Sequence, residues 1–158
     1  MSTVHCYDDD GLVHEVSSDS LAFSPAVYGI FIENDRLLLL SRNSTSLYTP
    51  PGCLLQANEV PTQAVRHYFR RLVGFTPALG SLLFVEDQYR WFDGRAWLVS
   101  ALYYAVERPF TDSIHINETL EPEHTAVWVD LLDLQRSQFQ FGFKAATAGI
   151  SHLALLRR

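Results

Sequence analysis

The amino-acid sequence predicts an α+β domain, in which helices pack against the faces of a partly antiparallel sheet. Several runs of alternating or continuous apolar residues have the length of β-strands. One amphipathic helical segment interrupts these runs near the middle of the chain, and a second helical pattern closes the sequence. Hairpin, strands, helix, strands and helix is an order typical of a mixed α+β architecture.

The first segment, VHCYDDDGLVHEV, predicts a β-hairpin, because two short arms with alternating apolar residues flank an Asp-Gly turn. We assign residues 1–20 to this N-terminal hairpin extension and residues 21–158 to the main domain. His5, Cys6 and His14 have no fourth partner and no recognised metal-site spacing, so they do not predict a metal centre. The Asp8–Asp10 run is expected to be a solvated turn.

Two strands and a helix are predicted next. The strands cover Ala26–Glu33 and Arg36–Ser41, joined by the turn END. The helix covers Pro61–Val73, since proline suits a first helical turn and Gly74 suits a helix stop. Its apolar stripe is Ala64, Val65, Tyr68, Phe69, Leu72 and Val73, and its basic side is Arg66, His67, Arg70 and Arg71.

The second half of the chain predicts three more strands and two helices. LGSLLFVEDQYRWF and RAWLVSALYYAVE read as long strands joined around FDG, and TAVWVDL reads as another strand. DLLDLQRSQ is interpreted as a short helix. The apolar residues between Lys144 and Leu156 recur at near-helical spacing, which predicts a C-terminal helix.

Composition excludes several classes of protein. A chain of 158 residues with 47% apolar and 13% aromatic residues suits one globular domain. A formal net charge of −6 argues against sequence-independent binding of nucleic acid, which needs many exposed basic residues. Two cysteines make no disulfide framework, and we expect Cys53 to be a small semi-buried residue. No signal-peptide pattern or membrane-length apolar run occurs, so we expect a cytoplasmic protein without membrane contact.

The segment from Pro50 to Phe75, PPGCLLQANEVPTQAVRHYFRRLVGF, resembles the signature of the Nudix hydrolases. That signature is glycine, five residues, glutamate, seven residues, then Arg-Glu-apolar-any-Glu-Glu-any-Gly-apolar. With Gly74 and Phe75 as the closing pair, Glu59 takes the first glutamate and Cys53 falls on the first glycine. The segments LLLLSR and EPEHTAVWVDLLDL are also similar to family segments. The resemblance implies a Nudix-type α/β/α sandwich with a mixed sheet.

The helical part of this signature is degenerate. The three glutamates that hold Mg²⁺ or Mn²⁺ in active family members are replaced by Tyr68, Arg71 and Leu72. Magnesium prefers hard oxygen ligands, whereas a phenol is a poor ligand, leucine offers none and arginine carries a fixed positive charge. Enzymatic activity is therefore uncertain and the metal ligands are unknown. The resemblance implies Mg²⁺ or Mn²⁺ as cofactor if the protein is active, and otherwise none.

The resemblance also names candidate site residues. By resemblance, Glu59 closes the loop, and one of Glu121 or Glu123 matches a late acid that can bind metal or position water, so these three are the catalytic candidates. Arg42, at the end of a strand, is the best candidate for a phosphate contact, and Arg71 is a second. Tyr48 is a candidate for stacking on a ligand. Further stacking candidates are Tyr89, Trp91, Phe92 and Trp97, although alternation predicts that about half of them face the core.

Three functions remain open. The first is a Nudix-like domain that binds a nucleotide or nucleoside-diphosphate-type ligand and has lost most hydrolysis. The second is an active metal-dependent hydrolase of a nucleoside diphosphate linked to another moiety. The third is a structural or partner-binding scaffold, for which the N-terminal hairpin offers strand edges. The resemblance favours a homodimer.

Overall fold

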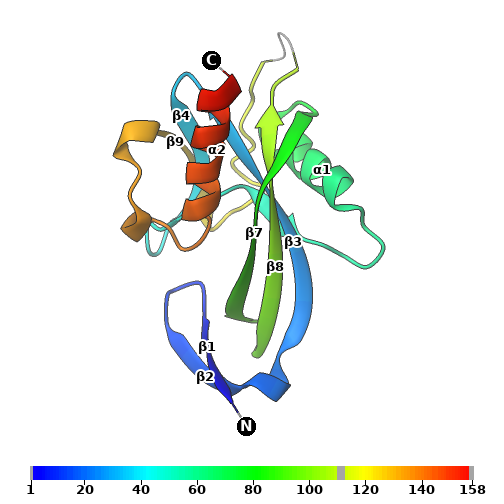
Figure 1. Ribbon diagram of the computed structural model, residues 1–158, viewed down its shortest axis with the longest axis vertical. Helices are drawn as coiled ribbons and strands as arrows, with labels where there is room; N and C mark the ends of the chain where they lie inside the picture. Colours follow the sequence, from blue (N-terminus) through cyan, green and yellow to red (C-terminus); the bar gives the residue numbers. More distant parts are fainter. Residues whose placement is uncertain (1, 110–112, 157–158) are drawn as a thin grey trace.

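The computed structural model describes residues 2–109 and 113–156, and it shows a curled mixed sheet with one α-helix on each face (Figure 1). The predicted α/β/α sandwich is confirmed, and so is the hairpin that precedes it. The hairpin consists of β1 (Thr3–Tyr7) and β2 (Val13–Ser17), which pair antiparallel. A short 3₁₀ turn, Ser18–Ser20, leads from the hairpin into the main sheet.

The centre of the sheet is built on β3 (Ala22–Glu33), which pairs antiparallel with β4 (Arg36–Arg42). Both strands are longer than predicted. The turn between them places Asn34 and Asp35 at positive φ, a conformation that asparagine and aspartate tolerate better than other non-glycine residues. This tight turn fixes the register of β3 and β4.

Long strands extend the sheet on one side of β3. β8 (Arg95–Glu107) runs parallel to β3, and β7 (Ala78–Phe92) pairs antiparallel with β8. The hairpin joins this edge where Tyr7 of β1 pairs with Arg90 of β7. β7 therefore lies between the hairpin and the rest of the sheet.

Short strands complete the other side. β4 pairs antiparallel with β9 (His124–Asp130) and with β5 (Tyr48–Thr49). β6 (Gly52–Leu54) pairs with the first half of β3, where Val27 lies opposite Cys53. These pairings bring the segment before the helix against the centre of the sheet.

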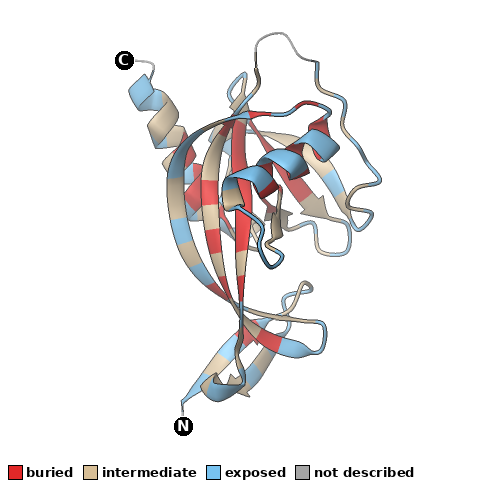
Figure 2. Ribbon diagram, turned by 90° about the vertical axis from the view of Figure 1, so that its right-hand side faces the viewer, coloured by how far each residue is buried: buried red, intermediate tan, exposed pale blue. Residues whose placement is uncertain are grey.

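The first helix, α1 (Pro61–Val73), has the predicted bounds. Gly74 adopts φ 85°, and its N–H donates to the carbonyl of Arg70 at 3.1 Å, which caps the helix. All six residues of the predicted apolar stripe are buried, and they pack on one face of the sheet (Figure 2). A Cβ at Gly29 would overlap the ring of Phe69, so a glycine at this position lets α1 approach β3 closely.

The second helix, α2 (Phe143–Leu156), packs on the opposite face, as predicted for the tail of the chain. Ala145, Ala146 and Gly149 are its buried residues. They join a second apolar cluster that includes Tyr28 and Ile30, whereas Val27 and Phe31 belong to the cluster under α1. The alternation of side chains along β3 thus supplies both cores.

The short helix predicted over DLLDLQRSQ is wrong. The segment forms two 3₁₀ turns, Leu131–Asp133 and Arg136–Gln138, separated by residues in extended conformation. Gln135 and Gln138 cap the second turn reciprocally, and the side chain of Gln138 accepts from the Gln135 N–H at 2.8 Å. Leu134 packs into the core under α2 while Leu132 is 98% exposed, which is not the burial pattern of a helical stripe.

Across the residues that the structure describes, no helix is both long and apolar enough to cross a membrane.

Candidate functional site

The loop before α1 is closed by Glu59. Its Oε1 accepts a hydrogen bond from the backbone N–H of Gln56 at 2.6 Å, and its own N–H donates to the carbonyl of Gln56 at 3.1 Å. These two bonds fold residues 56–59 into a turn directly before the helix. The carboxylate of Glu59 is therefore held at the entry to α1.

The three positions that the sequence resemblance aligns with helix glutamates differ in their environments. Leu72 is 1% exposed and belongs to the core under α1, whereas Arg71 is exposed. Tyr68 is buried, and its hydroxyl donates to Oε1 of Glu121 at 3.0 Å. Burial, together with the Glu121 carboxylate, raises the pKa of Tyr68, so the phenol stays neutral and anchors Glu121.

Cys53 lies near the charged groups of Glu59, Glu121 and Arg71. Burial, and then the carboxylates of Glu59 and Glu121, raise the pKa of its thiol to about 11, and the guanidinium of Arg71 acts in the opposite direction. Three of the predicted site residues thus act on one thiol, although they come from the loop, the helix and the segment before β9. The structure brings Glu59, Arg71 and Glu121 together around Cys53.

This group of residues does not fit a divalent metal ion. The hydroxyl of Tyr68 donates its hydrogen bond to Glu121, and a neutral phenol is a poor metal ligand. Leu72 offers no ligand atom, and Arg71 carries a fixed positive charge. Within residues 2–109 and 113–156, no three His, Cys, Asp or Glu side chains gather closely enough to hold a metal. Glu59 and Glu121 are the two acids that remain at this position.

Arg42 and Glu123 form a different cluster, at the turn of the hairpin. The Nη1 atom of Arg42 lies 3.2 Å from Oε2 of Glu123 and 3.7 Å from Oδ2 of Asp9, and its Nε lies 3.5 Å from Oδ1 of Asp10. The Arg42 side chain is 14% exposed. The predicted phosphate contact is therefore surrounded by carboxylates, and Glu123 points to Arg42 while Glu121 points to Tyr68.

Tyr48 contacts a segment in which the sequence analysis named no site residue. Its ring meets the ring of Phe139 edge-on, with 5.8 Å between the centroids. Its carbonyl also accepts from the N–H of Gln140 at 2.9 Å. These contacts hold the segment 136–142 beside β5, and this segment forms one wall of a pocket.

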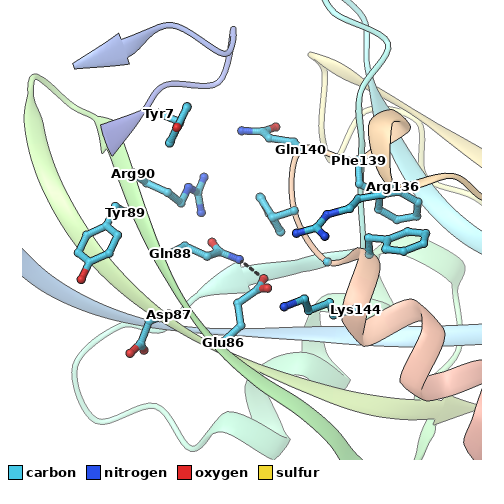
Figure 3. A pocket seen from close by; sticks show the side chains of 13 residues that line it. Tyr7, Glu86, Asp87, Gln88, Tyr89, Arg90, Arg136, Phe139, Gln140 and Lys144 are labelled. Carbon is cyan, nitrogen blue, oxygen red and sulfur yellow. Dashed lines mark hydrogen bonds between the residues drawn. The ribbon is translucent and has the colours of Figure 1, made fainter. Parts of the chain in front are cut away.

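The pocket has a volume of about 500 Å³ and lies between β7 and the start of α2, with the hairpin at its rim (Figure 3). It is lined by Tyr7, Glu86, Asp87, Gln88, Tyr89, Arg90, Arg136, Phe139, Gln140, Phe141, Gly142, Phe143 and Lys144. Glu86, Gln88 and Arg90 project from alternate positions of β7, and Arg136 and Lys144 lie across from them (Figure 3). Cationic and aromatic side chains thus share one concave surface.

A hydrogen-bonded group forms the polar side of the pocket on β7. Oε1 of Glu86 accepts from the Tyr103 hydroxyl at 2.6 Å. It also accepts from Nε2 of Gln88 at 2.8 Å (Figure 3). Nε2 of Gln88 also donates to the Tyr103 oxygen at 3.1 Å. Burial, and then the Glu86 carboxylate, raises the pKa of Tyr103, which keeps its hydroxyl a donor.

Arg90 is held at the rim of the pocket. Its guanidinium lies over the rings of Phe92 and Phe141, at 5.3 Å and 5.1 Å from their centroids. Its Nη1 donates to the hydroxyl of Tyr28 at 3.4 Å, and its Nη2 lies 3.6 Å from Oδ1 of Asp9. These contacts orient the guanidinium and link it to the hairpin.

Most of the side chains predicted to stack on a ligand stack instead on other rings of the protein. Trp91 stacks on His14 with 4.4 Å between centroids, and Phe92 stacks on Trp97 at 4.9 Å. Tyr89 lines the pocket but projects to the other side of β7 from Gln88 (Figure 3). The aromatic residues of the pocket wall come instead from Phe139, Phe141 and Phe143.

Sequence reasoning missed the pocket residues Glu86, Gln88, Arg136 and Lys144. One signal in the sequence points to the first two. Glu86, Gln88 and Arg90 alternate along a strand that is otherwise rich in apolar residues, so three polar side chains share one face. No comparable pattern marks Arg136, because the irregular backbone around it has no period.

Comparison with known proteins identifies the fold. No protein-family model matches the chain, and no curated protein matches it in sequence. Solved structures do match. The MutT Nudix hydrolase from Burkholderia pseudomallei has a TM-score of 0.61 and 20% identity, over 82% of this chain and 98% of its own.

Two further similar structures act on named nucleotides according to their descriptions. The Ap4A hydrolase from C. elegans has a TM-score of 0.54 and 15% identity, covering 87% of this chain and 98% of its own. An ADP-ribose pyrophosphatase from Streptococcus suis has a TM-score of 0.54 and 13% identity, covering 85% of this chain and 92% of its own. The resemblance seen in the sequence is thus supported by the three-dimensional arrangement, and the chain has the fold of the Nudix hydrolases.

Proposed function

We propose that this protein binds a nucleotide or nucleoside-diphosphate-type ligand in the pocket between β7 and α2, and that hydrolysis is weak or lost. The observation that carries the proposal is the lining of the pocket, which combines Arg90, Arg136 and Lys144 with aromatic rings from the segment 139–143. Phosphate groups pair with guanidinium and ammonium groups, and bases stack on aromatic rings. A nucleotide carries both kinds of partner.

The start of α2 adds to the attraction for an anion. Gly142, Phe143 and Lys144 line the pocket at the N-terminus of this helix of 14 residues. Backbone N–H groups at a helix N-terminus carry partial positive charge and bind phosphate. Two of the structural neighbours are named for nucleotides, Ap4A and ADP-ribose, and this supports a ligand of the same class.

We expect hydrolysis to be weak or lost because α1 lacks the carboxylates that would hold a metal ion. The carboxylates that the Nudix signature would supply are replaced by a buried tyrosine, a buried leucine and an exposed arginine. Glu59 and Glu121 are the carboxylates that remain beside this helix, and the positive charge of Arg71 near them repels a divalent cation. The ligand is therefore held by cations of the protein rather than through a metal ion.

Calorimetry with ADP, GDP, UDP and ADP-ribose in the presence of EDTA tests binding. We expect at least one of them to bind, and Arg136→Gln and Lys144→Gln to weaken it about tenfold each, the effect of losing one charge-assisted hydrogen bond. Arg66→Gln is the matched control, because Arg66 is an exposed arginine on α1, away from the pocket.

The same protein incubated with Mg²⁺ or Mn²⁺ tests hydrolysis. Rapid metal-dependent release of a nucleoside monophosphate would support an active hydrolase and contradict the proposed loss. Absence of binding to every nucleotide would contradict the proposal as a whole and favour a scaffold.

A further inference from the structure

We infer that the N-terminal hairpin regulates the pocket, because the carboxylate of Asp9 pairs with an arginine of the pocket that a phosphate group would also bind. This inference rests on the proposed function and deepens it, since it names a competitor of the ligand within the chain itself. It depends on the contacts of Asp9, on the surroundings of the Arg90 guanidinium and on the way in which the hairpin is attached.

Asp9 places a carboxylate at one end of the pocket. Its Oδ1 lies 3.6 Å from Nη2 of Arg90 and accepts a hydrogen bond from Nε2 of Gln140 at 3.3 Å. Arg90 and Gln140 both line the pocket, and they lie at the same end of it as Tyr7 of the hairpin (Figure 3). A carboxylate and a phosphate both present anionic oxygens that accept from a guanidinium. Asp9 therefore makes the contacts that a phosphate oxygen would make with these two side chains.

The guanidinium of Arg90 is already surrounded by other groups. The rings of Phe92 and Phe141 lie against it, with their centroids 5.3 Å and 5.1 Å from its central carbon. Its Nη1 donates to the hydroxyl of Tyr28 at 3.4 Å, and Asp9 lies at Nη2. The Arg90 side chain is 17% exposed. A phosphate that pairs with Nη2 therefore competes with the carboxylate of Asp9 for this nitrogen.

The contacts of Asp9 are of a kind that a ligand can replace. The Asp9 side chain is 41% exposed, and ion pairs of exposed carboxylates are weak because water screens them. A diphosphate carries more negative charge than one carboxylate, so cations attract it more strongly. Oδ2 of Asp9 lies 3.7 Å from Nη1 of Arg42, which gives the carboxylate a second cation once a ligand takes Arg90.

Competition at Arg90 couples ligand binding to the docking of the hairpin. The backbone pairing between the hairpin and β7 is a single pair, Tyr7 opposite Arg90, so losing the contacts of Asp9 removes a substantial part of the attachment. An anion bound at Arg90 weakens the docking of the hairpin, and the docked hairpin weakens the binding of the anion by the same factor. The hairpin thus lowers the apparent affinity of the pocket for its ligand.

Calorimetry with inorganic pyrophosphate and with ADP, both in EDTA, tests the competition on the full chain. Asp9→Asn keeps the size of the side chain and removes its charge. We expect this variant to bind each probe about threefold to tenfold more tightly than the unmodified chain, the effect of removing one exposed competing carboxylate.

Glu15→Gln is the matched control. It removes the same charge from the hairpin, at an exposed residue of β2 that takes no part in the ion pairs with Arg42 and Arg90. We expect it to change either affinity by less than about twofold, because salt screens exposed charges. A rise of equal size in Asp9→Asn and Glu15→Gln would show a general effect of charge and overturn the inference.

Amide hydrogen exchange of the unmodified chain provides a second measurement. Saturating pyrophosphate is expected to accelerate exchange in β1 and β2 severalfold, because it displaces Asp9, while exchange in β3 and β8 does not accelerate. Sodium chloride at the same ionic strength is the control. An anion that bound beside a docked hairpin would leave exchange in β1 and β2 unchanged or slow it, and either result would overturn the inference.

The outcomes separate the inference from the proposed function. Equal affinities of the unmodified chain and Asp9→Asn for both probes would overturn the competition and leave nucleotide binding intact. Absence of binding of either probe to both proteins would also overturn it, and the panel of nucleotides then decides whether the proposed function fails as well. The exchange measurement on the unmodified chain decides the matter even if a variant fails to fold.

Discussion

At the scale of single residues, Cys53 shows how the candidate site departs from a metal centre. The sequence resemblance aligns it with a signature glycine, and its thiol lies near Glu59, Glu121 and Arg71. Burial and the two carboxylates all favour the neutral thiol over the thiolate. A thiol with a raised pKa is a poor nucleophile at neutral pH, so Cys53 is structural rather than reactive.

The raised pKa of Cys53 predicts a pH-dependent part of the free energy of unfolding. Its pKa is about 11 in the folded chain against 9.0 ordinarily, so the folded state retains a proton that the unfolded state loses. This stabilisation is complete below pH 9 and is lost as the pH rises through about 11. Urea unfolding at pH 8, 9, 10 and 11 should show a smaller loss of stability for Cys53→Ala than for the unmodified chain. Identical slopes for both proteins would contradict the assignment.

The burial of residues that recur with a regular period could be predicted from the sequence. Contacts between residues far apart in the chain could not. The buried stripe of α1 follows from a spacing of 3.6 residues per turn, which is local information. The ion pairs of Arg42 with Asp9 and Asp10 join segments more than thirty residues apart, as the bond between Ser44 and Asp10 illustrates with a separation of 34. No local pattern encodes them.

At the scale of elements, α1 has the predicted bounds, and the resemblance in the sequence aligns three of its residues with metal-binding glutamates. Its bounds were predictable because Pro61 and Gly74 mark its ends. Tyr68 and Leu72 now contribute to the core, so glutamates at these two positions would be buried. Arg71 is the one of the three replacements that remains exposed and can be changed without disturbing the core.

Arg71→Glu is therefore predicted to create affinity for a divalent cation. It replaces the positive charge near Glu59 and Glu121 by a third carboxylate, and hard cations prefer carboxylate oxygens. We expect the affinity for Mn²⁺, measured by calorimetry, to rise about tenfold or more over the unmodified chain, because repulsion becomes attraction. Arg66→Glu changes the charge of the same helix by the same amount and serves as the control. An equal rise in both variants would show a general charge effect and contradict the site.

The segment 131–142 marks the limit of prediction for elements. Its sequence has enough leucine and glutamine to suggest a helix, yet the chain forms two 3₁₀ turns. Contacts from elsewhere determine this outcome, including the ring contact of Tyr48 with Phe139 and the packing of Leu134 under α2. Because this segment builds a wall of the pocket, the pocket could not be predicted either.

At the scale of the whole molecule, the N-terminal hairpin is attached to the sandwich by ion pairs of its turn as well as by the ring stack of His14 on Trp91. Asp9 contacts both Arg42 and Arg90, and its Oδ1 accepts from Nε2 of Gln140 at 3.3 Å. One aspartate thus links the hairpin to β4, to β7 and to the pocket wall. The backbone pairing between β1 and β7 is limited to Tyr7 opposite Arg90.

Asp9→Asn is predicted to loosen the hairpin without unfolding the sandwich. Exposed ion pairs each contribute less than about 1 kcal/mol, so the global free energy of unfolding should change by about that amount or less. Amide hydrogen exchange in β1 and β2 should accelerate severalfold, while exchange in β3 and β8 stays unchanged. Asp19→Asn, in the turn after β2, is the control. Unchanged exchange in the hairpin would show that Asp9 does not hold it.

The stacking of His14 on Trp91, with 1° between the ring planes, gives the hairpin an optical reporter. His14 belongs to β2 and Trp91 to β7, so the indole senses directly whether the two strands are in contact. The stacked imidazole is part of the immediate surroundings of the indole, on which indole emission depends. Separation of the hairpin from the sheet would remove this ring, and the change in Trp91 emission would then report the attachment of the N-terminal arm.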